Sequence, residues 1–176
     1  KNIDIYNNKI YNVGGAGITL AREKDGSTST LQNIRVFNNI IYDTDKEGVM
    51  LYNHTGDLGG GVLDNIKIMN NTIYNGISRN GIRVVHPYIS LATVYVFNNI
   101  VYQTALAPLN LKSEVVASNN LINTDPMFVN ETARNFKIKN GSPAINTGTG
   151  TNAPSFDFIY ATRPKRGGYD IGAYEY

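Results

Sequence analysis

The chain has 176 residues, enough for one domain with a sizeable hydrophobic core. Its formal net charge of +2 is too small for the basic surface of a typical nucleic-acid-binding protein, so we expect no nucleic-acid partner. Cysteine is absent, which excludes a disulfide framework and a cysteine-based metal site. The sequence contains no apolar run near the length of a membrane span, and we expect no such span.

One ten-residue pattern, built around a pair of asparagines, recurs along the chain. Its copies occupy residues 2–11, 33–42, 65–74 and, more weakly, 93–102 and 114–123. The asparagine pairs of these copies begin at Asn7, Asn38, Asn70, Asn98 and Asn119. Successive copies therefore begin 21 to 32 residues apart. A repeat of this length predicts one supersecondary unit stacked on copies of itself.

Each unit is expected to be built from strands. Apolar residues alternate within a copy, as at Ile34 and Val36 or Ile66 and Ile68, and this period of two is typical of strands. A second strand follows the asparagine pair, and a third begins at a glycine, in residues 17–20, 48–51 and 81–84. Three strands per repeat predict an all-β fold, a single-stranded parallel β-helix. We expect a right-handed coil and about five coils over residues 1–124.

The asparagine pairs are predicted to lie at the bend between the first two strands. Asparagine tolerates the left-handed backbone region better than other residues with a side chain. Stacked copies can also hydrogen-bond amide to amide along the coil axis, as an asparagine ladder. The glycines Gly17, Gly48 and Gly81 mark a second bend at matching places.

The unit Asn-Ile-x-Ile-x-Asn-Asn-x-Ile, followed by Gly-Ile-x-Leu, resembles the right-handed parallel β-helix repeats of the pectate-lyase-like superfamily. The resemblance covers most of the chain. It implies a secreted or cell-surface bacterial protein that acts on polysaccharide, with acidic polysaccharide as the expected partner. The chain starts inside a repeat, at Asn2, and we expect further coils before it.

Residues 125–176 abandon the repeat. Asp-Pro-x-Phe at 125–128, Gly-Ser-Pro-Ala-Ile at 141–145 and Asp-Ile-Gly-Ala-Tyr-Glu at 170–175 resemble the closing segment of secreted bacterial β-helix proteins. We expect this tail to belong to the same domain and to cap the open strand edges of the last coil. In the related pattern Asp-x-x-Gly-x-x-Arg, a tyrosine, Tyr160, replaces the glycine between Asp157 and Arg163.

Four charged residues of the tail are interpreted as structural. They are Asp157, Arg163, Asp170 and Glu175. We expect Arg163 to pair with Asp157 or with Asp170.

Two columns of large side chains are expected along the stack. One contains Tyr11, Tyr42, Tyr74 and Tyr102, and the other contains Tyr6, Phe37, Met69 and Phe97. Aromatic faces can stack on sugar rings, so a sugar platform is one interpretation. The other, which we favour, is that stacked coils bring like residues together and that ring–ring contacts simply stabilise the stack.

The face of the glycine-led strands is the expected groove. Thr19, Met50 and Arg83 occupy the same position in successive repeats. The resemblance to lyases implies β-elimination of a uronate, which needs a base and a group that neutralises the substrate carboxylate. The candidate catalytic residues are Arg83, His86, His54 and Tyr52. The candidate substrate-binding residues are Arg22, Thr19, Met50 and Asn53.

Acidic residues on the long connections provide two further hypotheses. A Ca²⁺ site could be formed by Asp25, Asp57 and Asp64, since carboxylate oxygens are the ligands that Ca²⁺ prefers. A hydrolase would need two carboxylates in the groove, and the same residues together with Glu23 are the available ones. Function is therefore expected to be lyase-like action on acidic polysaccharide, with hydrolysis second. The alternative is a non-catalytic carbohydrate-binding or structural β-helix.

Overall fold

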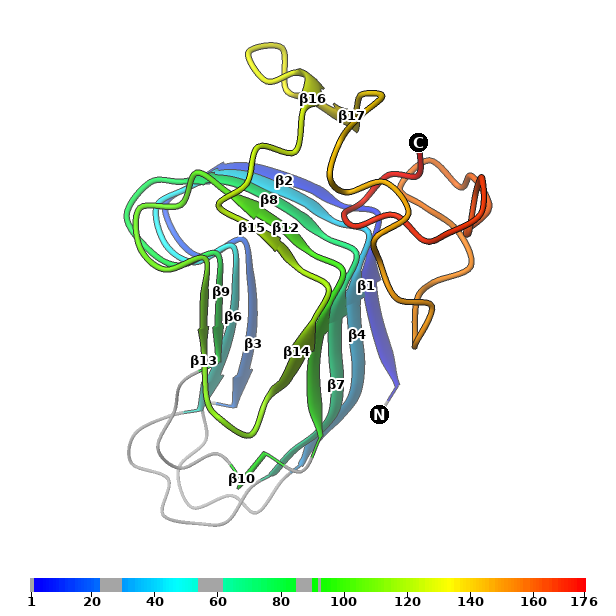
Figure 1. The fold of residues 1–176 in the computed structure, drawn as a ribbon. Coiled ribbons are helices and arrows are strands. Elements are labelled where there is room, and N and C mark those ends of the chain that lie inside the picture. Colours follow the sequence, from blue (N-terminus) through cyan, green and yellow to red (C-terminus); the bar gives the residue numbers. More distant parts are fainter. Residues whose placement is uncertain (1, 23–29, 54–61, 85–89, 92) are drawn as a thin grey trace.

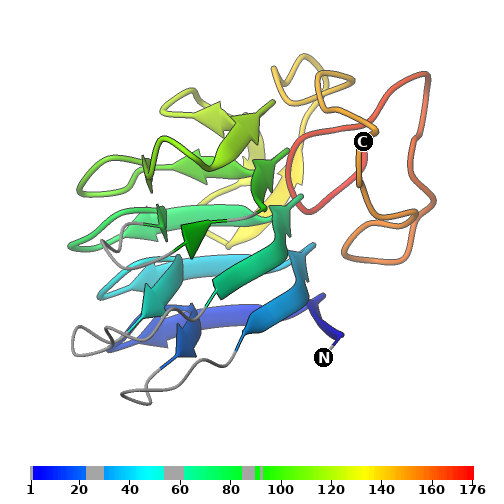
Figure 2. The ribbon, with the colours of Figure 1, turned by 90° about the horizontal axis from the view of Figure 1, so that it is seen from below.

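The computed structural model describes the whole chain except residues 1, 23–29, 54–61, 85–89 and 92 (Figure 1). Within the described residues it contains strands and no helix. Three parallel sheets, A, B and C, form the three walls of a stack, and Figure 2 shows the repeats as successive layers of that stack. The predicted all-β, parallel β-helix arrangement is confirmed. The right hand of the coil and the count of about five coils stay predictions.

The three sheets take one strand each from successive repeats, always paired in parallel. Sheet A runs β1 (Ile3–Tyr6), β4 (Leu31–Phe37), β7 (Val62–Met69), β11 (Val94–Phe97) and β14 (Val116–Ser118), and β10 (Ser90–Leu91) also pairs with β7. Sheet B runs β2 (Lys9–Val13), β5 (Ile40–Thr44), β8 (Thr72–Gly76), β12 (Ile100–Tyr102) and β15 (Leu121–Ile122). Sheet C runs β3 (Ile18–Arg22), β6 (Val49–Asn53), β9 (Ile82–Val84) and β13 (Leu109–Leu111).

The core lies inside the three walls. Ile34, Val36, Ile66 and Ile68, the alternating apolar residues of β4 and β7, are buried and pack with residues from sheets B and C. Burying such side chains is worth roughly 1.5–3 kcal/mol each, and it is repeated at every layer. The period-two pattern therefore decides which parity faces inward and which faces solvent.

The two asparagines of each pair do different work. The first residue of the pair takes the left-handed conformation, with φ of 53° at Asn38 and 52° at Asn70. The second residue forms the ladder, in which Asn39 Nδ2 donates to Asn71 Oδ1 at 3.0 Å and Asn71 Nδ2 donates to Asn99 Oδ1 at 2.9 Å. The predicted asparagine ladder is confirmed. It turns the chain between sheets A and B while leaving few buried amide atoms unpaired.

The first asparagines also hold the tail. Each one donates its side-chain amide to a backbone carbonyl of the tail: Asn7 to Phe158, Asn38 to Phe156, Asn70 to Asp170, Asn98 to Thr149 and Asn119 to Thr147. These bonds span all five copies of the repeat. The tail therefore runs along the flank of the stack, beside the bend between sheets A and B.

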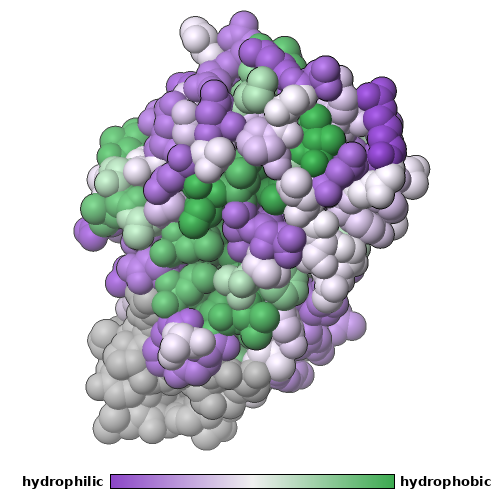
Figure 3. Space-filling view, viewed as in Figure 1, coloured by the Kyte–Doolittle hydropathy of each residue, from purple (hydrophilic) through white to green (hydrophobic). Residues whose placement is uncertain are grey.

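This position differs from the predicted one. Seen along the stack, the tail lies outside the three walls (Figure 1), and hydrophobic residues remain visible across the end of the stack (Figure 3). Each of the last strands, β13, β14 and β15, has one paired neighbour among the described residues. The expected cap over the last coil is thus wrong as to place. The reason is that the amides of the first asparagines point outward and offer the tail a row of donors.

The tail also covers the first aromatic column. Its antiparallel strands β16 (Phe128–Asn130) and β17 (Asn135–Ile138) place Phe136 with its ring 5.2 Å from the rings of both Tyr42 and Tyr74. Tyr42 and Tyr74 are consequently only 5% and 7% exposed. In the second column Phe37, Met69 and Phe97 are buried as well. These buried residues pack the stack and cannot serve as an open sugar platform, whereas Tyr11 and Tyr6, the first members of the two columns, are 50% and 39% exposed.

The four charged residues of the tail that were interpreted as structural are buried, as such a role requires. They are Asp157, Arg163, Asp170 and Glu175. The pairing is different from the predicted one, because Arg163 Nη1 donates to Glu175 Oε1 at 2.5 Å. Asp157 instead accepts the backbone N–H groups of Ile159, Ala161 and Glu175, and Asp170 those of Asn146 and Tyr176. The two aspartates thus close turns of the tail.

Candidate functional site

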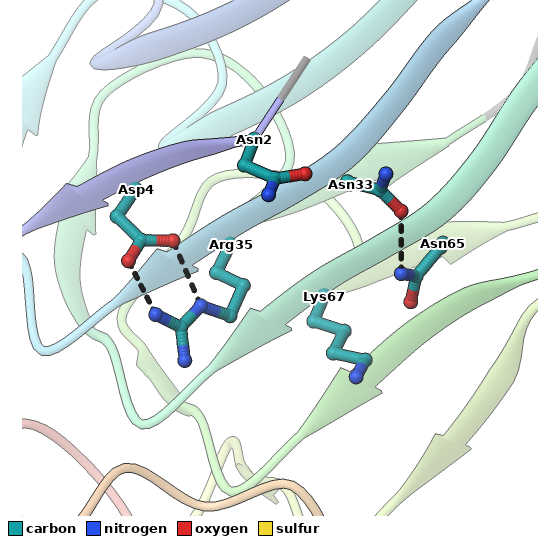
Figure 4. Close-up of a pocket in the computed structure, with 6 residues that line it drawn as sticks. All are labelled: Asn2, Asp4, Asn33, Arg35, Asn65 and Lys67. Atoms are coloured by element: carbon teal, nitrogen blue, oxygen red, sulfur yellow. Dashed lines mark hydrogen bonds and ion pairs between the residues drawn. The ribbon is translucent and has the colours of Figure 1, made fainter.

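Outward-facing residues of sheet A line a wide polar hollow of the described surface. Asp4, Arg35 and Lys67 are register partners on β1, β4 and β7. With a second polar rank they surround a basin of about 690 Å³ (Figure 4). That second rank consists of Asn2, Asn33 and Asn65. Because inward and outward residues alternate along a strand, the same pattern that fills the core also produces this polar face.

An ion pair lies in the basin. The Asp4 carboxylate accepts hydrogen bonds from Arg35, one from Nε at 2.8 Å and one from Nη2. These hydrogen bonds hold the pKa of Asp4 below its ordinary value and raise the pKa of Arg35. The Arg35 side chain is still 48% exposed, so its guanidinium can meet a ligand.

Three other basin residues, Asn33, Asn65 and Lys67, form hydrogen bonds with side-chain amides. Asn65 Nδ2 donates to Asn33 Oδ1 at 2.7 Å, and both residues have left-handed backbones. Lys67 Nζ donates to Oδ1 of Asn152, a residue of the tail, at 2.9 Å. A residue of the tail therefore holds one of the side chains that line the basin.

A second hollow of about 240 Å³ adjoins the first and shares Asp4 and Arg35 with it. Its other lining residues come from sheet A and from the tail: the aromatic Tyr6, Phe37 and Phe156, together with Pro154 and Ser155. The Arg35 guanidinium lies 5.2 Å from the centroid of the Phe37 ring. The site thus passes from polar amides, across an ion pair, to aromatic rings.

Sequence reasoning did not select these residues. In the repeat Asn-Ile-x-Ile, the two isoleucines drew attention as core, and the position between them was left unused. That position holds Asp4, Arg35 and Lys67, and the alternation of strands places it outward on one face. The outward-facing positions of the repeat therefore predict this row of charged residues.

The predicted groove on sheet C is in register as expected. Thr19 pairs with Met50, and Met50 with Arg83. Arg83 Nη1 lies 3.3 Å from Oε1 of Glu47, whose side chain is 3% exposed against 40% for Arg83. A buried carboxylate therefore orients a half-exposed guanidinium on this face, and Glu47 was not predicted.

Of the other residues predicted for the groove, the structure describes Tyr52 and the backbone of Arg22 and Asn53. Tyr52 lies on β6 in register with Ala21 of β3. His54 and His86 lie outside the described residues, as do the side chains of Arg22 and Asn53. Their proposed roles stay predictions.

Of the three residues predicted to bind Ca²⁺, the structure describes one. Asp25 and Asp57 lie outside the described residues. Asp64 is described, and its Oδ1 accepts a hydrogen bond from the Thr93 hydroxyl at 2.7 Å. In the part of the chain that the structure describes, no three His, Cys, Asp or Glu residues gather as metal ligands.

The described residues form no helix that is long and apolar enough to cross a membrane. A comparison with curated proteins and a comparison with solved structures found no match. One family model, described as "Disaggregatase related", matches residues 1–62. The matched segment holds the first two copies of the repeat and therefore Asn2, Asp4, Asn33 and Arg35 of the basin.

Proposed function

We propose that the chain binds acidic polysaccharide in the basin of sheet A, as part of a polysaccharide-acting β-helix protein. The observation that carries the proposal is the outward row of Arg35 and Lys67 between asparagine amides on an open parallel sheet. Two cations face one carboxylate there, so the basin favours an anionic ligand. Guanidinium and ammonium groups suit sugar carboxylates, and amides suit sugar hydroxyls.

Binding fits the basin better than hydrolysis does. A glycoside hydrolase needs two carboxyl groups flanking the scissile bond. Among the residues that line the basin, Asp4 is the one carboxylate, and Arg35 holds it in an ion pair. The geometry thus supports a surface that recognises a charged polymer.

Lyase-like elimination is the second candidate, and it belongs to sheet C. Arg83, whose guanidinium pairs with the buried Glu47, would neutralise the uronate carboxylate, as elimination requires. The base would come from Tyr52 or from His54 and His86. The resemblance of the repeat to the pectate-lyase-like superfamily supports this candidate, for which Ca²⁺ is the proposed cofactor.

The proposed setting is the outside of a bacterial cell, secreted or on the surface. The matched family is described as related to a disaggregatase, and binding or cutting an extracellular polymer is one chemical route to separating aggregates. Both proposed activities, binding and lyase-like elimination, have a polysaccharide as the ligand.

Replacing Arg35 or Lys67 by glutamine is expected to weaken binding to pectate, alginate or hyaluronate by about tenfold or more, since each loses a charge-assisted contact. Affinity gel electrophoresis measures this, with neutral dextran as the control polymer. Lys139→Gln is the matched control variant, because Lys139 is exposed on the tail away from the basin. Equal losses in Lys139→Gln and Lys67→Gln would contradict a site in the basin.

The lyase candidate predicts an ultraviolet-absorbing unsaturated product when the chain meets one of these polymers, with or without Ca²⁺. Arg83→Ala should reduce that rate by about a hundredfold, because the developing carboxylate charge loses its stabilising cation. Arg35→Gln tests whether the basin holds the polymer during the reaction. The absence of product with every polymer, from a folded and polymer-binding sample, would leave binding alone.

A further inference from the structure

Phe156 of the tail is the centre of a ring cluster beside the basin. Its centroid lies 5.8 Å from Tyr6 and 6.0 Å from Phe37, both edge to face. Tyr160 stacks on Phe156 at 5.2 Å with an angle of 21° between the planes. Sheet A and the tail thus jointly build an aromatic wall next to Arg35.

The wall is open to solvent and is held firmly from behind. Tyr6 is 39% exposed and Tyr160 is 67% exposed. The carbonyl of Phe156 accepts hydrogen bonds from Asn38 Nδ2 at 2.7 Å and from Arg163 Nε at 3.3 Å. The position of the wall is therefore fixed before any ligand arrives.

Tyr160 has an unfavourable backbone conformation. Its φ of 64° lies in the left-handed region, which this chain otherwise fills mostly with asparagine. A tyrosine is strained there, and Asn or Gly would fit the turn better. Strain of this kind is retained where a particular side chain serves a function.

We propose that Tyr6, Phe156 and Tyr160 form a stacking subsite for one sugar ring of an acidic polysaccharide. The inference rests on the proposed binding function and specifies its ligand. The apolar C–H face of a pyranose ring would lie on the exposed rings, because such faces pack well on aromatic ones. Arg35, which borders the aromatic hollow, would take the carboxylate of that sugar. The site therefore selects uronate residues over neutral sugars.

Tyr160→Asn and Tyr160→Phe separate the ring from the backbone strain. Tyr160→Asn removes the ring and suits the left-handed turn, so the melting temperature should stay equal or rise, while affinity for oligogalacturonate falls roughly fivefold to tenfold. Tyr160→Phe keeps the ring and should keep the affinity within about twofold. Calorimetric titration with oligogalacturonate and with neutral maltooligosaccharide gives the readout, and Arg35→Gln is measured in parallel.

Three outcomes distinguish the inference from the proposed function. A loss in Tyr160→Asn, with Tyr160→Phe unchanged and Arg35→Gln impaired, supports the subsite. Full affinity in Tyr160→Asn, with Arg35→Gln impaired, overturns the subsite and leaves the proposed function standing. The absence of binding by the unmodified chain overturns both.

Discussion

Replacing Asn71 by alanine is expected to lower the free energy of unfolding by about 3–5 kcal/mol. Asn71 is fully buried, and its Nδ2 donates to Val36 O at 2.9 Å and Met69 O at 3.1 Å as well as to the ladder. Its Oδ1 accepts both the backbone N–H and the side-chain amide of Asn39. Alanine removes the Asn71 amide and leaves its buried partner groups unpaired. A buried group without a hydrogen-bond partner costs about 1–3 kcal/mol. For a chain of this size the melting temperature should fall by roughly 8–15 °C.

Asn8→Ala is the graded control for that experiment. Asn8 stands at the exposed end of the same ladder, where its amide donates to Tyr6 O and to Asn39 Oδ1. Water can replace these contacts, so the loss should stay below about 1 kcal/mol. Thermal unfolding of both variants gives the comparison. Equal, small losses would show that the ladder does not stabilise the stack.

Much of the fold was predictable because it depends on local rules applied repeatedly. The alternation of apolar residues at Ile34 and Val36 determines which face of the strand is buried, and the asparagine at position 38 indicates a left-handed bend. Gly48 was predicted at a bend for its backbone freedom, yet the reason is close approach. A Cβ there would lie 2.6 Å from Cγ2 of Ile73 and 2.8 Å from the carbonyl of Gly81. Sequence spacing marks such a position without revealing the neighbour that demands it.

The site was harder to predict, because it joins a repeated row of sheet A to residues of the tail that no repeat relates to that row. The row of Asp4, Arg35 and Lys67 could have been found from the outward parity of the strands. The contributions of Asn152 and Phe156 depend on where a non-repeating tail folds. The tail follows the donors of the first asparagines along the flank, and the resemblance suggested the end of the stack instead. A motif can identify a closing segment without specifying which surface it closes.

Arg163→Ala is expected to destabilise the fold by about 3–5 kcal/mol, because it leaves the Glu175 carboxylate buried without its counter-ion. The guanidinium also donates to the carbonyls of Asp170 at 3.1 Å and Gly172 at 2.7 Å. Those carbonyls belong to the part of the tail that Asn70 holds against the stack. We therefore expect the tail to be cleaved faster in limited proteolysis, while the stack resists. An unchanged melting temperature and an unchanged cleavage pattern would contradict this.

Burying the Arg163–Glu175 ion pair opposes folding through desolvation of both charges, and a second variant can show this. Burial lowers the pKa of Arg163 and raises that of Glu175, so desolvation opposes the charged form of both groups. Removing both charges, in Arg163→Met with Glu175→Gln, should therefore be less destabilising than Arg163→Met alone. The N–H groups of Lys165 and Asp170 now donate to separate oxygens of Glu175, each at 3.0 Å, and the single carbonyl oxygen of the glutamine can still accept one of them. Thermal unfolding of the two single variants and the double variant forms a cycle. Losses that simply add would mean that Arg163 stabilises the tail through its carbonyl contacts and not through the charge of Glu175.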